Sequence, residues 1–247
     1  MCMLHSSTRI KINGMMGVMN TLLTPDYVVE DIVYIDPLTV SGLLTWHERD
    51  NQVVSGSDVR TWPNHSSLSA SYDLSSPSAS TQPQKIGNKV YFDGTHILQM
   101  ATINLQKFTM FLVIDPDETQ TLSNDGVIGR ALNDLIKVYR GSSPTRISFR
   151  FNGVNYDINA LSQSYPSGEF VMTVIRDGTG AITVRFNKTQ VGTRSSLILD
   201  LFDVNQIGSG TYSGVQYNGY INELLIYNGD LSSSDISDIE DFLISRI

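Results

Sequence analysis

Residues 219–247 constrain the fold more than any other part of the chain. Residues 220–227 are rich in Ile, Leu and Tyr, as expected of a largely buried β-strand, and the following Asn-Gly-Asp supplies a turn. Ser232 can cap a helix, with Asp235 in a box-like position three residues later. Apolar residues then recur at helical spacing, at Ile236, Ile239, Phe242, Leu243 and Ile247. The segment predicts a strand, a turn and a closing helix that packs on a β body.

Alternation of apolar and polar residues predicts two hairpins. Residues 147–151 and 154–158 flank Asn152-Gly153, a pair that tolerates the positive φ angles of a tight hairpin turn. Residues 170–175 and 181–186 flank a polar turn in the same way.

Four other segments carry weaker signals. Residues 195–202 predict a strand, and residues 26–38 predict a first strand. Residues 128–139 fit either a strand or a short helical turn. Residues 55–84 are poor in apolar side chains and predict a long surface excursion.

Several segments, in order, resemble the concanavalin A-like, laminin-G-like jelly-roll family. The family ends in a strand of the type G-x-I-x-E-x-x-I-Y-N followed by L-S and a short helix; the matching residues are Gly219, Ile221, Glu223, Ile226, Tyr227, Asn228, Leu231 and Ser232. Trp46 and Trp62 lie in segments similar to its paired tryptophan strands. Residues 90–94 resemble its F-D-G strand end, and residues 108–114 its central buried strand. Lys188 departs from the family's Asn-Gly turn.

The resemblance spans residues 43–247 and implies an all-β, two-sheet antiparallel jelly-roll sandwich with a short C-terminal helix. We therefore expect residues 1–40 to form an N-terminal arm and a first strand, and residues 41–247 to form the jelly-roll domain. The length of 247 residues agrees, because such sandwiches reach about 200–250 residues as one unit.

Charge and cysteine content exclude several classes of protein. The chain carries 25 acidic and 17 basic side chains, a formal charge of −8, and has no Lys/Arg-rich run, which argues against nucleic-acid binding. Cys2 is the single cysteine, so no intramolecular disulfide can form. The N-terminal residues do not resemble a secretory signal, and no apolar run approaches the roughly 18 residues of a membrane span.

Catalytic and metal-binding patterns are weak. Jelly-roll glucanases use an E-x-D-x-E array on one strand, and the nearest match is Glu48-Arg-Asp-Asn-Gln52. Here Gln52 stands where the array has its second glutamate, and its amide cannot serve as the proton-donating acid. The four histidines lack zinc spacing. Asp115, Asp117 and Asp125 could collect a calcium ion, although solvated loop carboxylates are the commoner outcome. We expect no enzyme activity, no cofactor and no bound metal.

Aromatic and methionine side chains give the candidate binding residues. Trp46 and Trp62 could stack on sugars, but their place in the strand motifs favours core packing. Tyr212 and Tyr217, flanked by Ser and Gly, are the candidates for an exposed glycan platform, with packing in a turn as the alternative. In the arm, Met15, Met16 and Met19 suit a segment that packs either on a partner or back on its own sandwich.

Two functions are consistent with these observations. The first is a non-enzymatic structural protein on the surface of a virus particle, such as a phage capsid decoration, cement or tail-associated subunit. It would be a homo-oligomer whose partners are capsid or tail proteins. The alternative is a carbohydrate-binding, lectin-like module that meets host glycans outside the cell. Neither function involves nucleic acid or a membrane.

Overall fold

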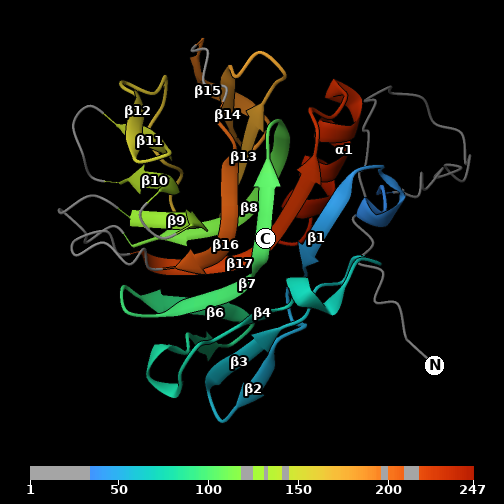
Figure 1. Cartoon of the computed structure of the whole chain (residues 1–247), viewed down its shortest axis with the longest axis vertical. Helices are drawn as coiled ribbons and strands as arrows, with labels where there is room; N and C mark the ends of the chain where they lie inside the picture. Colours follow the sequence, from blue (N-terminus) through green and yellow to red (C-terminus); the bar gives the residue numbers. More distant parts are fainter. Residues whose placement is uncertain (1–33, 118–124, 131–132, 141–144, 196–199, 209–216) are drawn as a thin grey trace, which may run out of the picture.

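The protein forms two stacked antiparallel sheets and one C-terminal helix (Figure 1). The structure is a computed structural model that describes residues 34–117, 125–130, 133–140, 145–195, 200–208 and 217–247. The predicted fold class, an all-β jelly-roll sandwich closed by a short helix, is confirmed. The arm up to residue 33, with Met15, Met16 and Met19, lies outside the described residues.

The first sheet has the strand order β15-β14-β13-β8-β17-β1. Its bounds are β1 (Leu43–His47), β8 (Phe108–Pro116), β13 (Phe170–Arg176), β14 (Ile182–Phe186), β15 (Thr189–Arg194) and β17 (Asn218–Asn228). The long β17 pairs with β8 along its whole length, and this pair forms the centre of the sheet.

The second sheet has the order β4-β7-β16-β9-β10-β11-β12. Its bounds are β4 (Leu74–Ser75), β7 (Ile97–Leu105), β9 (Asp125–Arg130), β10 (Asp134–Tyr139), β11 (Arg146–Phe151), β12 (Val154–Ile158) and β16 (Phe202–Gly208). At one edge the two sheets are joined by β2 (Val53–Ser55), β3 (Asp58–Trp62), β5 (Gln84–Ile86) and β6 (Lys89–Asp93). Three 3₁₀ turns span Pro37–Thr39, Ala70–Tyr72 and Ala79–Thr81.

Alternation along β8 divides the core into two clusters. Phe108, Met110 and Leu112 point between the sheets, whereas Phe111 and Val113 point to the outer face of the first sheet. The two tryptophans fall one in each cluster: Trp62 is 0% exposed between the sheets, and Trp46 is 5% exposed on the outer face. Their predicted role in core packing is confirmed.

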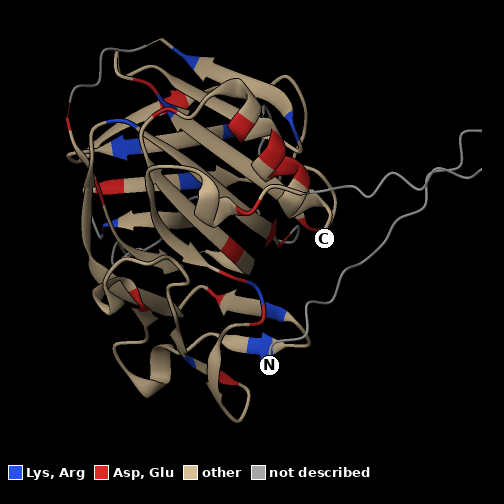
Figure 2. Ribbon diagram, turned by 90° about the vertical axis from the view of Figure 1, so that its right-hand side faces the viewer, with Lys and Arg blue, Asp and Glu red and all other residues tan. Residues whose placement is uncertain are grey.

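Helix α1 (Ser233–Ile244) covers one end of that outer face. The Ser232 hydroxyl accepts a hydrogen bond from the Asp235 amide at 3.1 Å, which confirms the predicted cap. Ile236, Ile239 and Leu243 are buried against the sheet. The rest of the helix is acidic and carries no Lys or Arg (Figure 2). The predicted closing helix is therefore correct in place and in orientation.

The predicted hairpins also form. Asn152 and Gly153 have φ angles of 46° and 84°, and Asn187 and Lys188, the pair that departs from the family pattern, have 44° and 74°. Lys188 thus takes the left-handed conformation that Gly would take more easily. Residues 128–139 fitted either a strand or a helical turn; of these, residues 128–130 belong to β9 and residues 134–139 to β10.

Two local predictions differ from the structure in their described residues, and a third falls mostly outside them. Residues 55–84 contain β3, β4 and two 3₁₀ turns, and β5 begins at Gln84. They are not simply a long surface loop, because the side chains of Val59, Trp62 and Leu74 are all buried. Of the strand expected at 195–202, residues 196–199 lie outside the described residues, and Phe202 is the first residue of β16. Within 26–38, the described part from Tyr34 onward holds a 3₁₀ turn at Pro37 and no strand.

Candidate functional site

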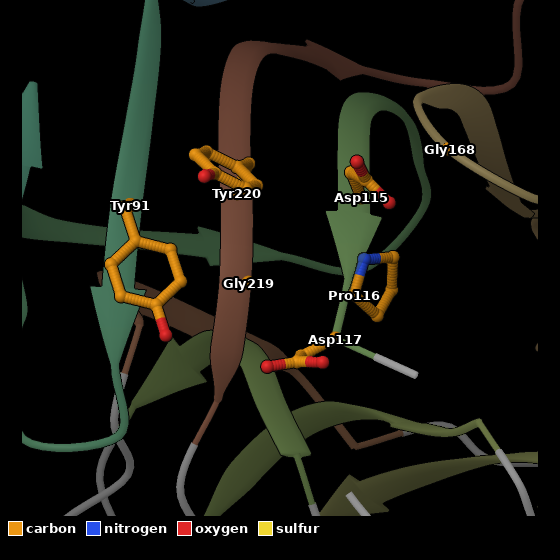
Figure 3. A pocket seen from close by; sticks show the side chains of 7 residues that line it. All are labelled: Tyr91, Asp115, Pro116, Asp117, Gly168, Gly219 and Tyr220. Carbon is orange, nitrogen blue, oxygen red and sulfur yellow. The ribbon is translucent and has the colours of Figure 1, made fainter. Parts of the chain in front are cut away.

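Three side chains from three adjacent strands form a row on the outer face of the first sheet. Tyr220 of β17 lies opposite Tyr91 of β6 on one side and opposite Asp115 of β8 on the other. The two tyrosine ring centroids are 5.1 Å apart, with the ring planes tilted by 54°. Figure 3 shows the rings side by side, with Asp115 on the far side of Tyr220. The row therefore offers two aromatic rings and a carboxylate to one ligand.

The row lies beside a cavity of about 540 Å³, lined also by Pro116, Asp117, Gly168 and Gly219. All three members of the row are partly exposed. Further along the same face of β8, Phe111 and Val113 are covered by helix α1. The helix thus closes one end of the outer face and leaves the other end, with the row, accessible to a ligand of small-molecule size.

Gly219 forms the floor of the cavity, and a residue with a side chain would not fit at this position. Its φ is +131°, and a Cβ would lie 2.5 Å from the Asp115 carbonyl oxygen and 2.8 Å from the Pro116 Cα. The close approach of β17 and β8 depends on this missing side chain. Gly168, at φ +71°, has nothing within 4 Å of its would-be Cβ and exposes its backbone at the rim.

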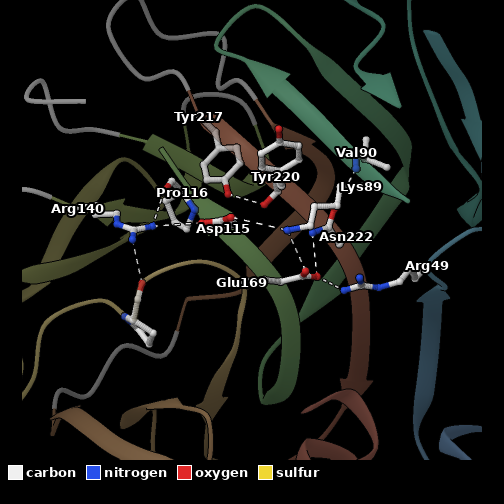
Figure 4. A network of polar contacts seen from close by, with 11 residues as sticks. Arg49, Lys89, Val90, Asp115, Pro116, Arg140, Glu169, Tyr217, Tyr220 and Asn222 are labelled. Carbon is white, nitrogen blue, oxygen red and sulfur yellow. Dashed lines mark hydrogen bonds and ion pairs between the residues drawn. The ribbon is translucent and has the colours of Figure 1, made fainter. Parts of the chain in front are cut away.

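Lys89 places a positive charge at the edge of the row. It shares the outward face of β6 with Tyr91, two residues away. Its ammonium lies 3.2 Å from Glu169 Oε2, 4.0 Å from Asp115 Oδ2 and 5.4 Å from the centre of the Tyr220 ring (Figure 4). Arg140 holds Asp115 from the other side at 3.4 Å. These contacts fix the orientation of the Asp115 carboxylate.

A β-bulge at Asn222 organises the rest of the network. β17 pairs with β6 before the bulge and with β1 after it. The Asn222 side chain accepts from the Val90 amide at 2.9 Å and donates to Glu169 Oε1 at 3.0 Å. Glu169 also pairs with Arg49 (Figure 4). The bulge therefore anchors the side chain that holds Lys89 in place.

The electrostatics of the row favour a neutral Tyr91. Burial, followed by the nearby carboxylates of Asp117 and Asp93, raises the pKa of Tyr91 above its usual value. The phenol therefore stays protonated at neutral pH and can donate a hydrogen bond to a ligand hydroxyl.

Glu223 lies between the row and helix α1, on the same face of β17. Its Oε1 accepts from the Trp46 indole at 2.9 Å, and its Oε2 is 3.3 Å from Arg246 Nε. Burial raises the pKa of Glu223 to about 7, against the opposing effects of Arg246 and the indole hydrogen bond. Arg246 also reaches Glu48 at 3.2 Å, and so joins the C-terminus to the end of β1.

The tyrosines predicted from the sequence are not the tyrosines of the row. Tyr217 is 0% exposed: its ring packs on Phe92 between the sheets, and its hydroxyl donates to the Tyr220 carbonyl at 2.7 Å. The expected exposed platform is therefore wrong for Tyr217, because its Ser- and Gly-rich neighbourhood flanks a residue that enters the core. Tyr212 lies outside the described residues.

Sequence reasoning missed Tyr91 and Tyr220. Tyr91 lies between the inward-pointing Val90 and Phe92, and Tyr220 directly precedes the inward-pointing Ile221. Strand alternation alone places both rings on the outer face. Their lateral alignment could not be predicted, since it requires the strand order and the register.

The carboxylates considered for metal binding or catalysis form no metal-binding group among the described residues. Asp115 and Asp117 both line the cavity, whereas nothing is described of the Asp125 side chain. Among the described residues, no group of three or more His, Cys, Asp or Glu side chains is placed to hold a metal. β1 ends at His47, and Asp50 has a φ of 69°, so Glu48 and Asp50 do not share the strand face that a glucanase array needs.

Within the described part of the chain, no helix is both long and apolar enough to span a bilayer. No protein-family model matches the sequence, and neither does any curated protein.

Solved structures with similar folds include an arabinanase domain, a neurotoxin binding domain and a sialidase. Domain 4 of AbnA, a GH43 extracellular arabinanase from Geobacillus stearothermophilus, solved with arabinotriose, matches 80% of this chain and 98% of its own length, with a TM-score of 0.52 and 15% identity. The binding domain of botulinum neurotoxin DC, solved with SialylT, matches 82% of this chain and 52% of its own length, with a TM-score of 0.55 and 13% identity.

Trypanosoma rangeli sialidase, solved with the inhibitor DANA, gives a TM-score of 0.56 at 12% identity over 82% of this chain and 33% of its own. The chain therefore spans about half of the neurotoxin domain and a third of the sialidase. At these identities the similarity establishes the β-sandwich fold and nothing more specific.

Proposed function

We propose that this protein binds carbohydrate without cleaving it, and that the row of Tyr91, Tyr220 and Asp115 is the binding site. The observation that carries the proposal is the alignment of two partly exposed aromatic rings and an oriented carboxylate beside a cavity of about 540 Å³. Sugar rings present C–H faces that pack on aromatic rings, and hydroxyls that donate to carboxylates. The cavity volume lies within the range of about 300–1,000 Å³ that is usual for small-molecule sites.

Two further observations support this function. Lys89 and Gly168 add a cationic donor and an exposed backbone at the rim, which suits a ligand with many hydroxyl groups. The similar AbnA domain was solved with arabinotriose, a sugar bound on a comparable fold. An extracellular location follows as part of the proposal, because polymeric glycans are met there.

A glycan array probed with the whole chain, followed by calorimetry on the strongest hit, tests the proposal. Tyr220→Ala should weaken binding by about tenfold, which corresponds to about 1.4 kcal/mol. Tyr220→Phe is the matched control: it keeps the ring face and should retain most of the affinity. A silent array, or equal affinity in the wild type and Tyr220→Ala, would remove this function. Release of sugar fragments during the same assay would contradict the non-enzymatic part.

A place on a virus particle is the first of the two functions predicted from the sequence. Its docking residues Met15, Met16 and Met19 lie outside the described residues. The comparisons support carbohydrate binding better, and the capsid or tail partner and the homo-oligomer stay predictions. Deleting residues 1–20 should abolish particle association while the sandwich stays folded; unchanged association would count against this function.

A further inference from the structure

A basic cluster lies on the outer face of the second sheet, whereas the row of Tyr91, Tyr220 and Asp115 lies on the outer face of the first. On this face of β10 and β11, Lys137 lies opposite Ser148, Tyr139 opposite Arg146, and Leu135 opposite Arg150. Arg146 and Arg150 flank Ser148 at two residues on either side, so all three share a face. Figure 1 shows β10, β11 and β12 together at one end of the sheet, away from helix α1. One hydroxyl is thus surrounded by three cationic side chains.

Two of these cations have no carboxylate partner in the part of the chain that the structure describes. Lys137 is 4% exposed, and its ammonium donates a hydrogen bond to Asn155 Oδ1 at 3.2 Å. The Arg146 guanidinium stacks on the Tyr139 ring at 4.1 Å and forms no ion pair with any described residue. A positive charge that is removed from water without an opposite charge is costly.

The hydroxyl at the centre is also without a partner. Ser148 is 0% exposed, and its Oγ has no hydrogen-bond partner among the described residues. Buried hydroxyls are nearly always hydrogen-bonded, so an unpartnered one among cations indicates a missing acceptor or donor. On the next strand a single carboxylate, Asp157, faces Ser148. On the other side of β10, the residues of β9 that lie opposite Lys137 and Leu135 are Gly126 and Gly129, which carry no side chain.

We infer that Lys137, Arg146, Arg150 and Ser148 form an anion-binding site for an oxyanion such as a sulfate group or the carboxylate of an acidic sugar. Lys137 and Arg146, which form no ion pair among the described residues, place positive charge on this face in a chain whose formal charge is −8. A tetrahedral or planar oxyanion accepts from ammonium, guanidinium and hydroxyl donors at once. Burial, then the neighbouring Arg150 and Arg146, also lowers the pKa of Lys137, as expected of a cation that an anion would stabilise.

The proposal predicts opposite effects on stability and on binding. Ser148→Ala removes a hydroxyl that bonds to nothing, so the free energy of unfolding without ligand should stay the same or rise. Lys137→Met removes a buried cation and should likewise not lower it. Both variants should nevertheless lose affinity for anions. Substitution of a residue with a purely structural role would instead lower the free energy of unfolding and leave the affinity for anions unchanged.

The test is calorimetric titration of the whole chain with sodium sulfate, sodium glucuronate and glucose at constant ionic strength. Saturable binding of glucuronate, of sulfate or of both is expected, and none of glucose; sulfate alone would identify a site for sulfate groups. Lys137→Met should weaken it by about tenfold and Ser148→Ala by about fivefold, since charge-assisted and hydroxyl contacts are lost. Lys107→Gln, which removes an exposed lysine paired with Asp230, is the matched control and should bind as the wild type does.

Several results would overturn the proposal. These are no saturable binding of either anion, equal binding of glucose and glucuronate, or undiminished binding in both Lys137→Met and Ser148→Ala. Tyr220→Ala separates this site from the carbohydrate row: anion binding should persist in that variant, and its loss would place the anion elsewhere. Sulfate binding together with glucuronate binding would identify a general oxyanion site, and glucuronate alone an acidic-sugar site.

Discussion

Glu223 should make the stability of the fold depend on pH. Its pKa is 4.5 in an unfolded chain and about 7 in the folded protein, because burial between the sheet and helix α1 disfavours the carboxylate. Below about pH 4.5 the group is protonated in both states. Between that pH and about 7 the folded state keeps a proton that the unfolded state has lost, so folding stability falls as the pH rises. Each pKa unit is worth about 1.4 kcal/mol, which sets the loss at up to about 3 kcal/mol.

Glu223→Gln isolates this effect, since the amide does not titrate and its oxygen can still accept from the Trp46 indole. Urea unfolding of both proteins at pH 4.5, 5.5, 6.5 and 8 gives the free energy of unfolding. The wild type minus variant difference should decline by up to about 3 kcal/mol across this range. Asp238→Asn, an exposed position on helix α1, controls for the loss of one negative charge. A difference that stays constant or grows with pH would show that Arg246, rather than burial, sets the protonation of Glu223.

Three further substitutions test the packing of the fold. Trp62→Ala should lower the free energy of unfolding by about 3–5 kcal/mol in urea, because the ring is wholly buried between the sheets. Glu240→Ala removes the acceptor of Thr173 and Arg185 under helix α1, and should cost about 2 kcal/mol by the same assay, less than a fully buried pair because Arg185 is partly exposed. Gly219→Ala should lower the melting temperature and weaken any glycan binding, since its Cβ would strike the backbone of Asp115 and Pro116; a melting temperature equal to the wild type would refute that contact.

The fold could be predicted from the sequence where local signals agree with tertiary packing. The closing strand and helix carry caps, turn residues and an apolar stripe within residues 219–247, so each element is specified by its own segment. The hairpin at Asn152-Gly153 is specified in the same way. Residues 55–84 were misjudged because their strands are only two to five residues long, too short to display alternation, and depend on a few buried side chains such as Trp62.

The candidate site could not be found from the sequence because its members are far apart in the chain. Tyr91, Asp115 and Tyr220 meet only through the pairing of β6 and β8 with β17, and that register is set by the bulge at Asn222 and by Gly219. Composition around a tyrosine was a poor guide: the Ser- and Gly-rich surroundings of Tyr217 indicated exposure, whereas the ring is buried. The basic cluster around Ser148 likewise appears only when β10 and β11 are paired.

A crystal structure of the chain with the tightest glycan from the array tests the central claim most directly. We predict a sugar ring against Tyr91 and Tyr220, with a hydroxyl on Asp115, in the cavity above Gly219. A sugar bound elsewhere on the molecule, with the row unoccupied, would contradict the proposed site.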